Sequence, residues 1–238
     1  MRFFYPIAGY SAPMLVRTLA GGALLALAAP ATAQAMPTMQ PLKPCYVTSK
    51  TEGEPPQSEN MQIAATGFTS NSDVRLTIDG APVPGGDNLK VGMSGELVLP
   101  PVEAPFVKSG HRTFTVTLTE VDNPTNTVSA TAESAALGVT LKPKSARPSQ
   151  RIRFKGLGFT GDAPIYAHYV RKGKLRKSVR IAREPGDCGG FKVRRRQFPM
   201  KNPQLGVWTV QFDQSKQFVE PPVTNFVRLM IRVRLVPR

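Results

Sequence analysis

The sequence has few of the residues on which most metal and nucleophilic sites depend. It contains 2 histidines, His111 and His168, and 2 cysteines in 238 residues. Two histidines are too few for a histidine-rich metal centre, and two cysteines cannot complete a structural zinc site. No glycine loop is followed by Lys-Ser or Lys-Thr, which excludes a phosphate-binding loop, and the scattered acidic residues lack calcium-loop spacing. We therefore expect neither a metal nor a cofactor.

No long hydrophobic run occurs after the amino-terminal region. Within that region, an apolar run from Leu19 to Ala29 follows positively charged residues and ends in small ones. This order predicts a secretory signal peptide over residues 1–35, with cleavage after Ala33 or Ala35. The run is about half of the ~20 residues that a membrane-spanning helix needs. We expect the mature protein to be secreted or associated with the cell envelope.

Positive charge is unevenly distributed along the chain. The net charge is +15, from 31 Lys and Arg against 16 Asp and Glu. Residues 36–138 contain 6 basic and 11 acidic residues, a net of −5, whereas residues 139–238 contain 23 and 5, a net of +18. The basic excess belongs to the second half, and we expect that half to contact any anionic partner.

The two cysteines, Cys45 and Cys188, lie in different halves of the chain. In an oxidising compartment an even count favours one disulfide. Closing so long a loop is worth about 5 kcal/mol in the chain-entropy model, and the bond would tie the two halves together. The alternative is two separate buried or free thiols.

The chain contains an internal repeat. Residues 61–69, Met-Gln-Ile-Ala-Ala-Thr-Gly-Phe-Thr, align with residues 152–160, Ile-Arg-Phe-Lys-Gly-Leu-Gly-Phe-Thr, at an offset of 91. In each copy an alternating segment enters a Gly-Phe-Thr corner, and a polar turn leads to a second alternating segment. Alternation with period two indicates strands with one buried face, as in an antiparallel sandwich. The offset matches the length of one sandwich domain.

Further alternating segments, separated by turn residues, cover the rest of the chain. We predict six strands in the first half and seven in the second, with turns such as Asp79-Gly80 and Lys172-Gly173 between them. The predicted strands are residues 45–49, 62–67, 73–78, 97–100, 113–119 and 127–132, and then 139–141, 152–156, 165–170, 178–181, 191–198, 206–212 and 227–235. No segment has a sustained apolar period of 3.6 residues. The predicted fold is all-β: two tandem Ig-like β-sandwich domains after the signal peptide, an acidic one at 36–138 and a strongly basic one at 139–238.

The Gly-Phe-Thr corner and the strand after it resemble the Ig-like repeats of exported bacterial surface proteins, over residues 60–80 and 151–171. Other stretches are similar to a family of exported, largely uncharacterised bacterial proteins. They are residues 165–170 (Ile-Tyr-Ala-His-Tyr-Val), 188–191 (Cys-Gly-Gly-Phe), 194–199 (Arg-Arg-Arg-Gln-Phe-Pro) and 206–213 (Gly-Val-Trp-Thr-Val-Gln-Phe-Asp). Both resemblances imply a fold more than an activity, and neither supplies a catalytic residue.

The candidate functional residues are basic and fall into three groups along the sequence: the first at residues 171–177, the second at residues 228–234 and the third at residues 194–196. If they lie on neighbouring strands, they form one positive surface for an anionic envelope polymer or membrane surface. The alternative is a solvated face that only keeps the protein soluble and protects sheet edges. Nucleic acid is disfavoured by export and by the lack of interleaved aromatic residues. The candidate anion-binding residues are Arg171, Lys172, Lys174, Arg176, Lys177, Arg194, Arg195, Arg196, Arg228, Arg232 and Arg234.

The functional prediction is an exported, non-enzymatic binding or structural protein. Trp208 alternates with polar residues, which favours a core position over a carbohydrate platform. The alternative from another class is a cell-wall hydrolase or transpeptidase that uses Cys188 with His168 as its base. The sequence lacks the motif of such transpeptidases around Cys188, so we predict no enzyme. Binding of a protein partner through a sheet edge stays open.

Overall fold

The computed structural model describes residues 36–50, 55–222 and 225–234. The predicted signal peptide lies outside these residues. Apart from one 3-10 turn, η1 (Asp187–Gly189), every regular element of the described ranges is a β-strand, so the all-β prediction is confirmed. These ranges include no helix that is long and apolar enough to cross a membrane. Their buried apolar side chains form two clusters, one in each half of the chain.

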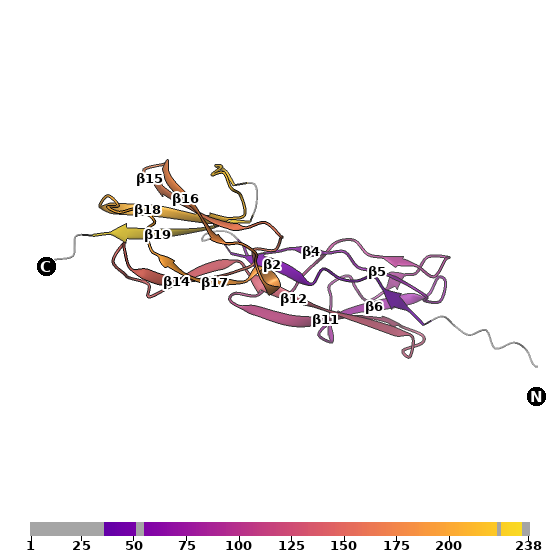
Figure 1. Ribbon diagram of the computed structural model, residues 1–238. Coiled ribbons are helices and arrows are strands. Elements are labelled where there is room, and N and C mark those ends of the chain that lie inside the picture. Colours follow the sequence, from indigo (N-terminus) through magenta and orange to yellow (C-terminus); the bar gives the residue numbers. More distant parts are fainter. Residues whose placement is uncertain (1–35, 51–54, 223–224, 235–238) are drawn as a thin grey trace, which may run out of the picture. The chain divides into compact units, whose positions relative to one another are not determined.

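The first cluster is formed by residues of the amino-terminal half, whose strands are drawn in indigo to magenta in Figure 1. The largest sheet has the order β3-β2-β12-β11-β6-β7, and β8 also pairs with β6; the smaller sheets are β1-β5-β9 and β10-β4. Val74 and Val116 of the largest sheet belong to this cluster, and so do Ala65 and Leu97 of the sheet β1-β5-β9. The strands are β1 (Thr38–Met39), β2 (Cys45–Ser49), β3 (Gln57–Ser58), β4 (Asn60–Met61), β5 (Ala64–Thr66), β6 (Asp73–Ile78), β7 (Ala81–Pro82), β8 (Leu89–Lys90), β9 (Leu97–Val98), β10 (Val102–Glu103), β11 (His111–Glu120) and β12 (Thr127–Ala136).

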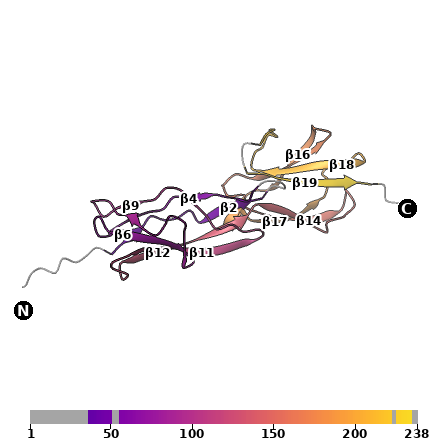
Figure 2. The ribbon, with the colours of Figure 1, turned by 180° about the vertical axis from the view of Figure 1, so that it is seen from behind.

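The second cluster lies between two sheets, with the strand orders β13-β14-β17 and β16-β15-β18-β19 (Figures 1 and 2). The rings of Phe154 on β14 and Phe212 on β18 meet across the core, with centroids 6.1 Å apart. Trp208 is buried beside Phe198, which confirms its predicted core position. The strands are β13 (Gly138–Lys142), β14 (Arg151–Leu157), β15 (Ile165–Arg171), β16 (Lys174–Ala182), β17 (Phe191–Arg196), β18 (Gly206–Asp213) and β19 (Val227–Val233).

The repeated Gly-Phe-Thr corner has the same backbone conformation in both halves. Gly67 and Gly158, 91 residues apart, have φ of 89° and 83°. A Cβ at Gly67 would lie 2.9 Å from the Met36 carbonyl oxygen, and one at Gly158 would lie 2.8 Å from the Cα of Leu137. At each glycine, the chain segment that leads into the first strand of that half passes too close for a side chain. The positive φ also favours glycine at both positions. Phe68 and Phe159, the next residues, are both buried in the cores.

The predicted and observed strands differ mainly in length. Six strands of two residues each, β1, β3, β4, β7, β8 and β10, were not predicted, because two residues show no period. β16 begins at Lys174, whereas alternation predicted only Ser178–Ile181. Lys172 and Gly173 both have positive φ, which closes the β15–β16 hairpin with a two-residue turn and extends the pairing to Lys174. The division into domains at 138/139 stays a prediction; β12 is followed by Leu137 and then β13.

Candidate anion-binding surface

The register of β13, β14 and β17 aligns basic side chains on one face of their sheet. Lys142 lies opposite Arg153, which lies opposite Arg194. In the next row Lys155 lies opposite Lys192. Because alternate residues point to opposite faces, the apolar residues between them enter the core. We call the outward cations the basic face: Lys142, Arg151, Arg153, Lys155, Lys192, Arg194 and Arg196.

No acidic residue interrupts the basic face. The strands β13, β14 and β17 contain no Asp or Glu, all seven cations are exposed, and none of them forms an ion pair with a described residue. Lys142, Arg153, Lys155 and Lys192 also line a shallow recess of about 350 Å³ together with Thr140. The face is therefore both highly charged and slightly concave.

This arrangement costs the fold some stability. Residues directly opposite on antiparallel strands have Cβ atoms roughly 5 Å apart, and like charges there are unfavourable. Four such pairs occur on the basic face: Lys142 with Arg153, Arg151 with Arg196, Arg153 with Arg194 and Lys155 with Lys192. A sequence that breaks a local rule without a structural gain is expected mainly at functional sites. The pairs therefore favour a binding role over a merely soluble surface.

The predicted anion-binding residues fall into separate places in the structure. Lys172, Lys174, Arg176 and Lys177 are exposed on the β15–β16 hairpin. Arg171 donates hydrogen bonds to Gln204 and to the Leu205 carbonyl oxygen, which anchors the loop before β18.

The strand β19 supplies a second group. Arg232 is exposed on β19 and Arg234 just after it. Arg228 is bound instead, because its Nη2 lies 3.1 Å from Glu220 Oε1 and its Nε donates to Gln211 Oε1.

The condition under which the three basic groups would form one surface, that they lie on neighbouring strands, is not met. β16 and β19 are opposite edges of one sheet, separated by β15 and β18, and β17 belongs to the other sheet. Within the third group, Arg194 and Arg196 belong to the basic face. Arg195 lies opposite the buried Ile152 and is directed to the other face.

Five residues of the basic face were not among the candidate anion-binding residues: Lys192 on β17 and four on the strands β13 and β14. Lys142, Arg151, Arg153 and Lys155 are contributed by β13 and β14. The alternation Arg-Ile-Arg-Phe-Lys at 151–155 carries the same signal as Lys192, Arg194 and Arg196. The pairing of these strands was not visible there, because about 35 residues and two strands of the other sheet separate β14 from β17.

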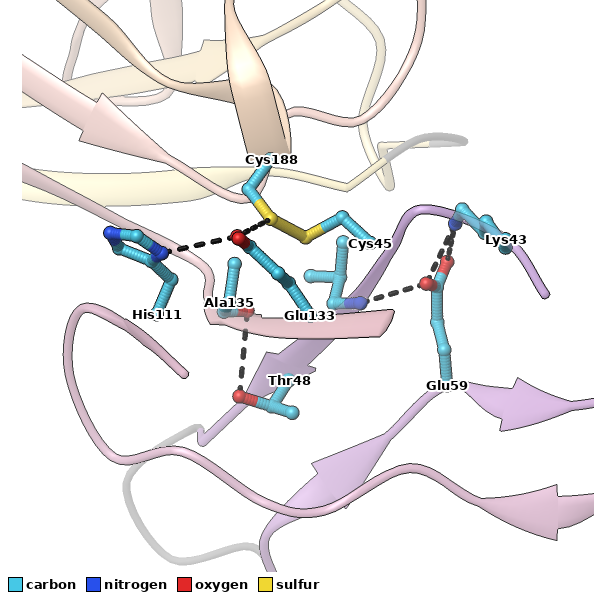
Figure 3. Close-up of a disulfide and its surroundings, with 9 residues drawn as sticks. Lys43, Cys45, Thr48, Glu59, His111, Glu133, Ala135 and Cys188 are labelled. Carbon is cyan, nitrogen blue, oxygen red and sulfur yellow. Dashed lines mark hydrogen bonds and ion pairs between the residues drawn. A yellow bond between two sulfur atoms is a disulfide. The ribbon is translucent and has the colours of Figure 1, made fainter. Parts of the chain in front are cut away.

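The predicted disulfide between Cys45 and Cys188 is present (Figure 3). Cys45 begins β2, whose Val47 N–H donates to Glu59. Glu133 Oε2 lies 3.1 Å from both Cys188 Sγ and His111 Nδ1. A disulfide sulfur has no hydrogen to donate, so only the contact with His111 can be a hydrogen bond. The bond fixes the loop of η1 to β2.

The loop that carries Cys188 also rests on the second Gly-Phe-Thr corner. Gly158 N–H donates to the Cys188 carbonyl oxygen at 2.9 Å, and Phe159 N–H donates to the Gly189 carbonyl oxygen at 3.3 Å. With Cys188 bonded to Cys45, the thiol-enzyme hypothesis has no nucleophile in this structure.

His168 belongs to a different, buried network. Its Nε2 donates to Asp213 Oδ1 at 3.2 Å and to the Ser215 carbonyl oxygen at 3.1 Å, and its Nδ1 lies 2.8 Å from Ser178 Oγ. The ring of Phe218 packs against it. His168 is 0% exposed, so a substrate has no access to its ring. The network fastens the segment after β18 onto β15.

Burial alone would raise the pKa of Asp213, but hydrogen bonds from His168, Gln211 and the Ser215 N–H outweigh it and hold the pKa below its usual value. The carboxylate is therefore ionised in the folded protein at neutral pH. Among the residues that the structure describes, no group of three or more His, Cys, Asp or Glu side chains could hold a metal ion.

Comparison with known proteins gives no family for this chain. No family model matches the sequence, and no curated protein matches it. The chain is similar to the crystal structure of bovine butyrophilin, with 10% identity, a TM-score of 0.29 and coverage of 80% of this chain and 99% of that one. It is similar to the YadV chaperone (9%, 0.27, 84% and 100%) and to the E. coli chaperone DraB (11%, 0.27, 83% and 98%). These values assign neither family nor function.

Proposed function

We propose that this protein is an exported, non-enzymatic binding protein whose basic face holds an anionic polymer of the cell envelope. The observation that carries the proposal is the register of β13, β14 and β17, which brings seven cations together without a carboxylate on these strands. Export rests on the predicted signal peptide and is supported by the disulfide, which is typical of oxidising compartments.

The spacing of the cations suits a linear polyanion. Cations on adjacent strands are roughly 5 Å apart at their Cβ atoms, and those two residues apart along a strand are about 7 Å apart. A polymer with phosphate or carboxylate groups at similar intervals neutralises several cations at once and releases its counterions. It also relieves the repulsion between the opposed like charges.

A polymer fits the face better than a membrane or a nucleic acid. Among the described residues, none of the large apolar side chains that are exposed lies on β13, β14 or β17, so the face offers no anchor for a bilayer. It presents no aromatic side chain on which a base could stack either, because the aromatic residues of these strands, Phe154 and Phe191, are buried.

The test is retention of the mature protein on purified cell envelope over a salt series. We expect retention at low salt that is lost as salt rises. The variant Arg153→Ser/Lys155→Ser/Lys192→Ser removes three cations around the recess and should be released at much lower salt. The matched control, Lys174→Ser/Arg176→Ser/Lys177→Ser, removes three cations from the hairpin and should behave like the wild type.

Two results would contradict the proposal. One is equal loss of retention in both triple variants, because it would reduce the effect to net charge. The other is strong binding to vesicles of anionic phospholipid together with no binding to the polymer fraction of the envelope, because it would identify a membrane surface as the ligand.

A further inference from the structure

A groove opens between the two sheets of the second half, along β13 and β19. It has a volume of about 740 Å³ and is lined by β13 and the segment after it, by the two residues that follow β17, and by β19 with the residue after it. Leu141, Phe198, Leu229 and Ile231 supply apolar walls. Leu141, Leu229 and Ile231 are only partly buried although they pack against the core. The interior of the sandwich is therefore incompletely covered here.

Both walls of the groove are free strand edges. β13 pairs only with β14, and β19 pairs only with β18. Within the described residues, neither strand makes a backbone hydrogen bond on its other side. Every second residue of an edge strand directs its N–H and C=O outward, so β19, with seven residues, presents a row of unused donors and acceptors. Such an edge is a template for another strand.

The charges around the groove are all positive. Lys144, Arg232 and Arg234 line it, and no acidic residue does. Arg232 shares the outward face of β19 with Arg228, but Arg228 is already paired with Glu220. A strand added beside β19 would place its own outward residues next to Arg232, where an opposite charge is favourable.

We propose that the groove binds an extended, acidic peptide segment of a partner protein, which adds to the free edge of β19. Its inward side chains are apolar and cover Leu229 and Ile231, and its outward side chains are Asp or Glu and pair with Arg232 and Arg234. This is β-strand addition, in which main-chain hydrogen bonds supply affinity and alternate side chains supply specificity.

An acyl chain with an anionic head group would also match an apolar groove with a basic rim. The peptide is favoured because an acyl chain leaves the N–H and C=O groups of both edges unpaired, whereas a strand satisfies those of one edge. The groove extends along β19 from Leu229 to Arg234, the residue after the strand, and this length also matches a strand of ordinary length.

The experiment uses the mature protein and a fluorescent peptide of about nine residues, an ordinary strand length, in which valine alternates with glutamate. Binding is measured by anisotropy, and protection of the β19 amides by hydrogen exchange. We expect saturable binding, slower exchange in β19, and no binding of the peptide in which lysine replaces glutamate. Two further peptides are N-methylated, one at the odd and one at the even positions. The peptide whose methyl groups replace the amide hydrogens that face β19 should fail to bind, and the other should bind.

Matched variants locate the site. Arg232→Glu/Arg234→Glu should weaken the acidic peptide by about tenfold or more, since opposed charges become repulsive, and Lys174→Glu/Arg176→Glu on the hairpin should leave it unchanged. Melting curves establish that both variants are folded. The proposal is overturned by an absence of binding, by equal effects of the two variants, or by tolerance of both N-methylated peptides. It is also overturned if dodecanoate occupies the groove while no peptide protects β19.

Discussion

Arg153 on β14 lies directly opposite Arg194 on β17, with no carboxylate on either strand. Two exposed arginines in this position repel one another, and the adjacent rows repeat the arrangement with Lys155 and Lys192 and with Arg151 and Arg196. The basic face thus stores a small unfavourable energy that a bound polyanion would remove. Under the proposed function, fold stability and ligand binding are therefore in conflict at these residues.

That conflict predicts opposite effects of one substitution. Arg153→Glu places a carboxylate between Lys142 and Arg194, so the free energy of unfolding should rise by roughly 0.5 kcal/mol while binding to a polyanion weakens. Urea unfolding measures the first effect and polyphosphate binding the second. Arg176→Glu on the hairpin is the control and should change neither by a comparable amount. A destabilised Arg153→Glu protein would show that the arginines are not in repulsive contact.

The disulfide should contribute a large share of the stability. Cys45 and Cys188 are 143 residues apart, and closing a loop of that length gives up to about 5 kcal/mol in the chain-entropy model. We expect Cys45→Ser/Cys188→Ser to unfold at a clearly lower urea concentration than the wild type. Mass spectrometry of the non-reduced secreted protein checks the bond itself. Two free thiols in that product would refute the pairing.

The second Gly-Phe-Thr corner should not tolerate a side chain. In Gly158→Ala the new Cβ meets the Leu137 backbone at 2.8 Å, and the residue keeps a φ of 83°. We expect a loss of about 1–3 kcal/mol or more. Gly80→Ala is the matched control, because Gly80 has a φ of 77° but nothing within 4 Å of the added Cβ. Equal losses in the two variants would mean that the close approach to Leu137 does not matter.

The Asp213 network predicts an acid-sensitive stability. The pKa of Asp213 in the folded protein lies below its ordinary value of 3.8, so the folded state gains stability above that value. The gain is lost as the pH falls from 3.8 through the folded pKa. The free energy of unfolding, measured by urea titration at successive pH values, should therefore decrease on acidification below about pH 4.

Asp213→Asn should remove part of this pH dependence and cost about 1–3 kcal/mol at neutral pH, because it weakens the hydrogen bonds of the buried His168. Asp162→Asn, at an exposed position, serves as the control. If Asp213→Asn retained the acid sensitivity of the wild type in full, the assignment to this carboxylate would be wrong.

The sequence was sufficient for elements whose pattern is local. The strands predicted at residues 45–49 and 73–78 have the bounds of β2 and β6 in the structure. The Asp79-Gly80 turn after β6 was predicted from its residue types, and both residues indeed have positive φ. The repeat of the Gly-Phe-Thr corner also held, because its geometry depends on a glycine at one position. Such features need only neighbouring residues.

The candidate site needed information that is not local. The basic face depends on which strands are paired and in which register, and β17 pairs with β14 rather than with a strand near it in sequence. Alternation along β15 directs His168 to the face opposite Ala167 and Tyr169, but it gives no sign that the segment containing Ser215 and Phe218 covers this ring. Arg228 was predicted to bind an anion, but in the structure it donates hydrogen bonds to Gln211 and Glu220, which are 17 and 8 residues away in the sequence.

The most direct test of the central claim is the salt dependence of binding to long-chain polyphosphate. Seven neutralised cations at about 0.7 per charge give a slope of log K against log salt near −5, and we expect a value between about −3 and −5. In the variant Arg153→Ser/Lys155→Ser/Lys192→Ser the slope should become shallower by about 2, whereas the hairpin variant should keep it. A slope that does not change when the three cations of the basic face are removed would contradict the account.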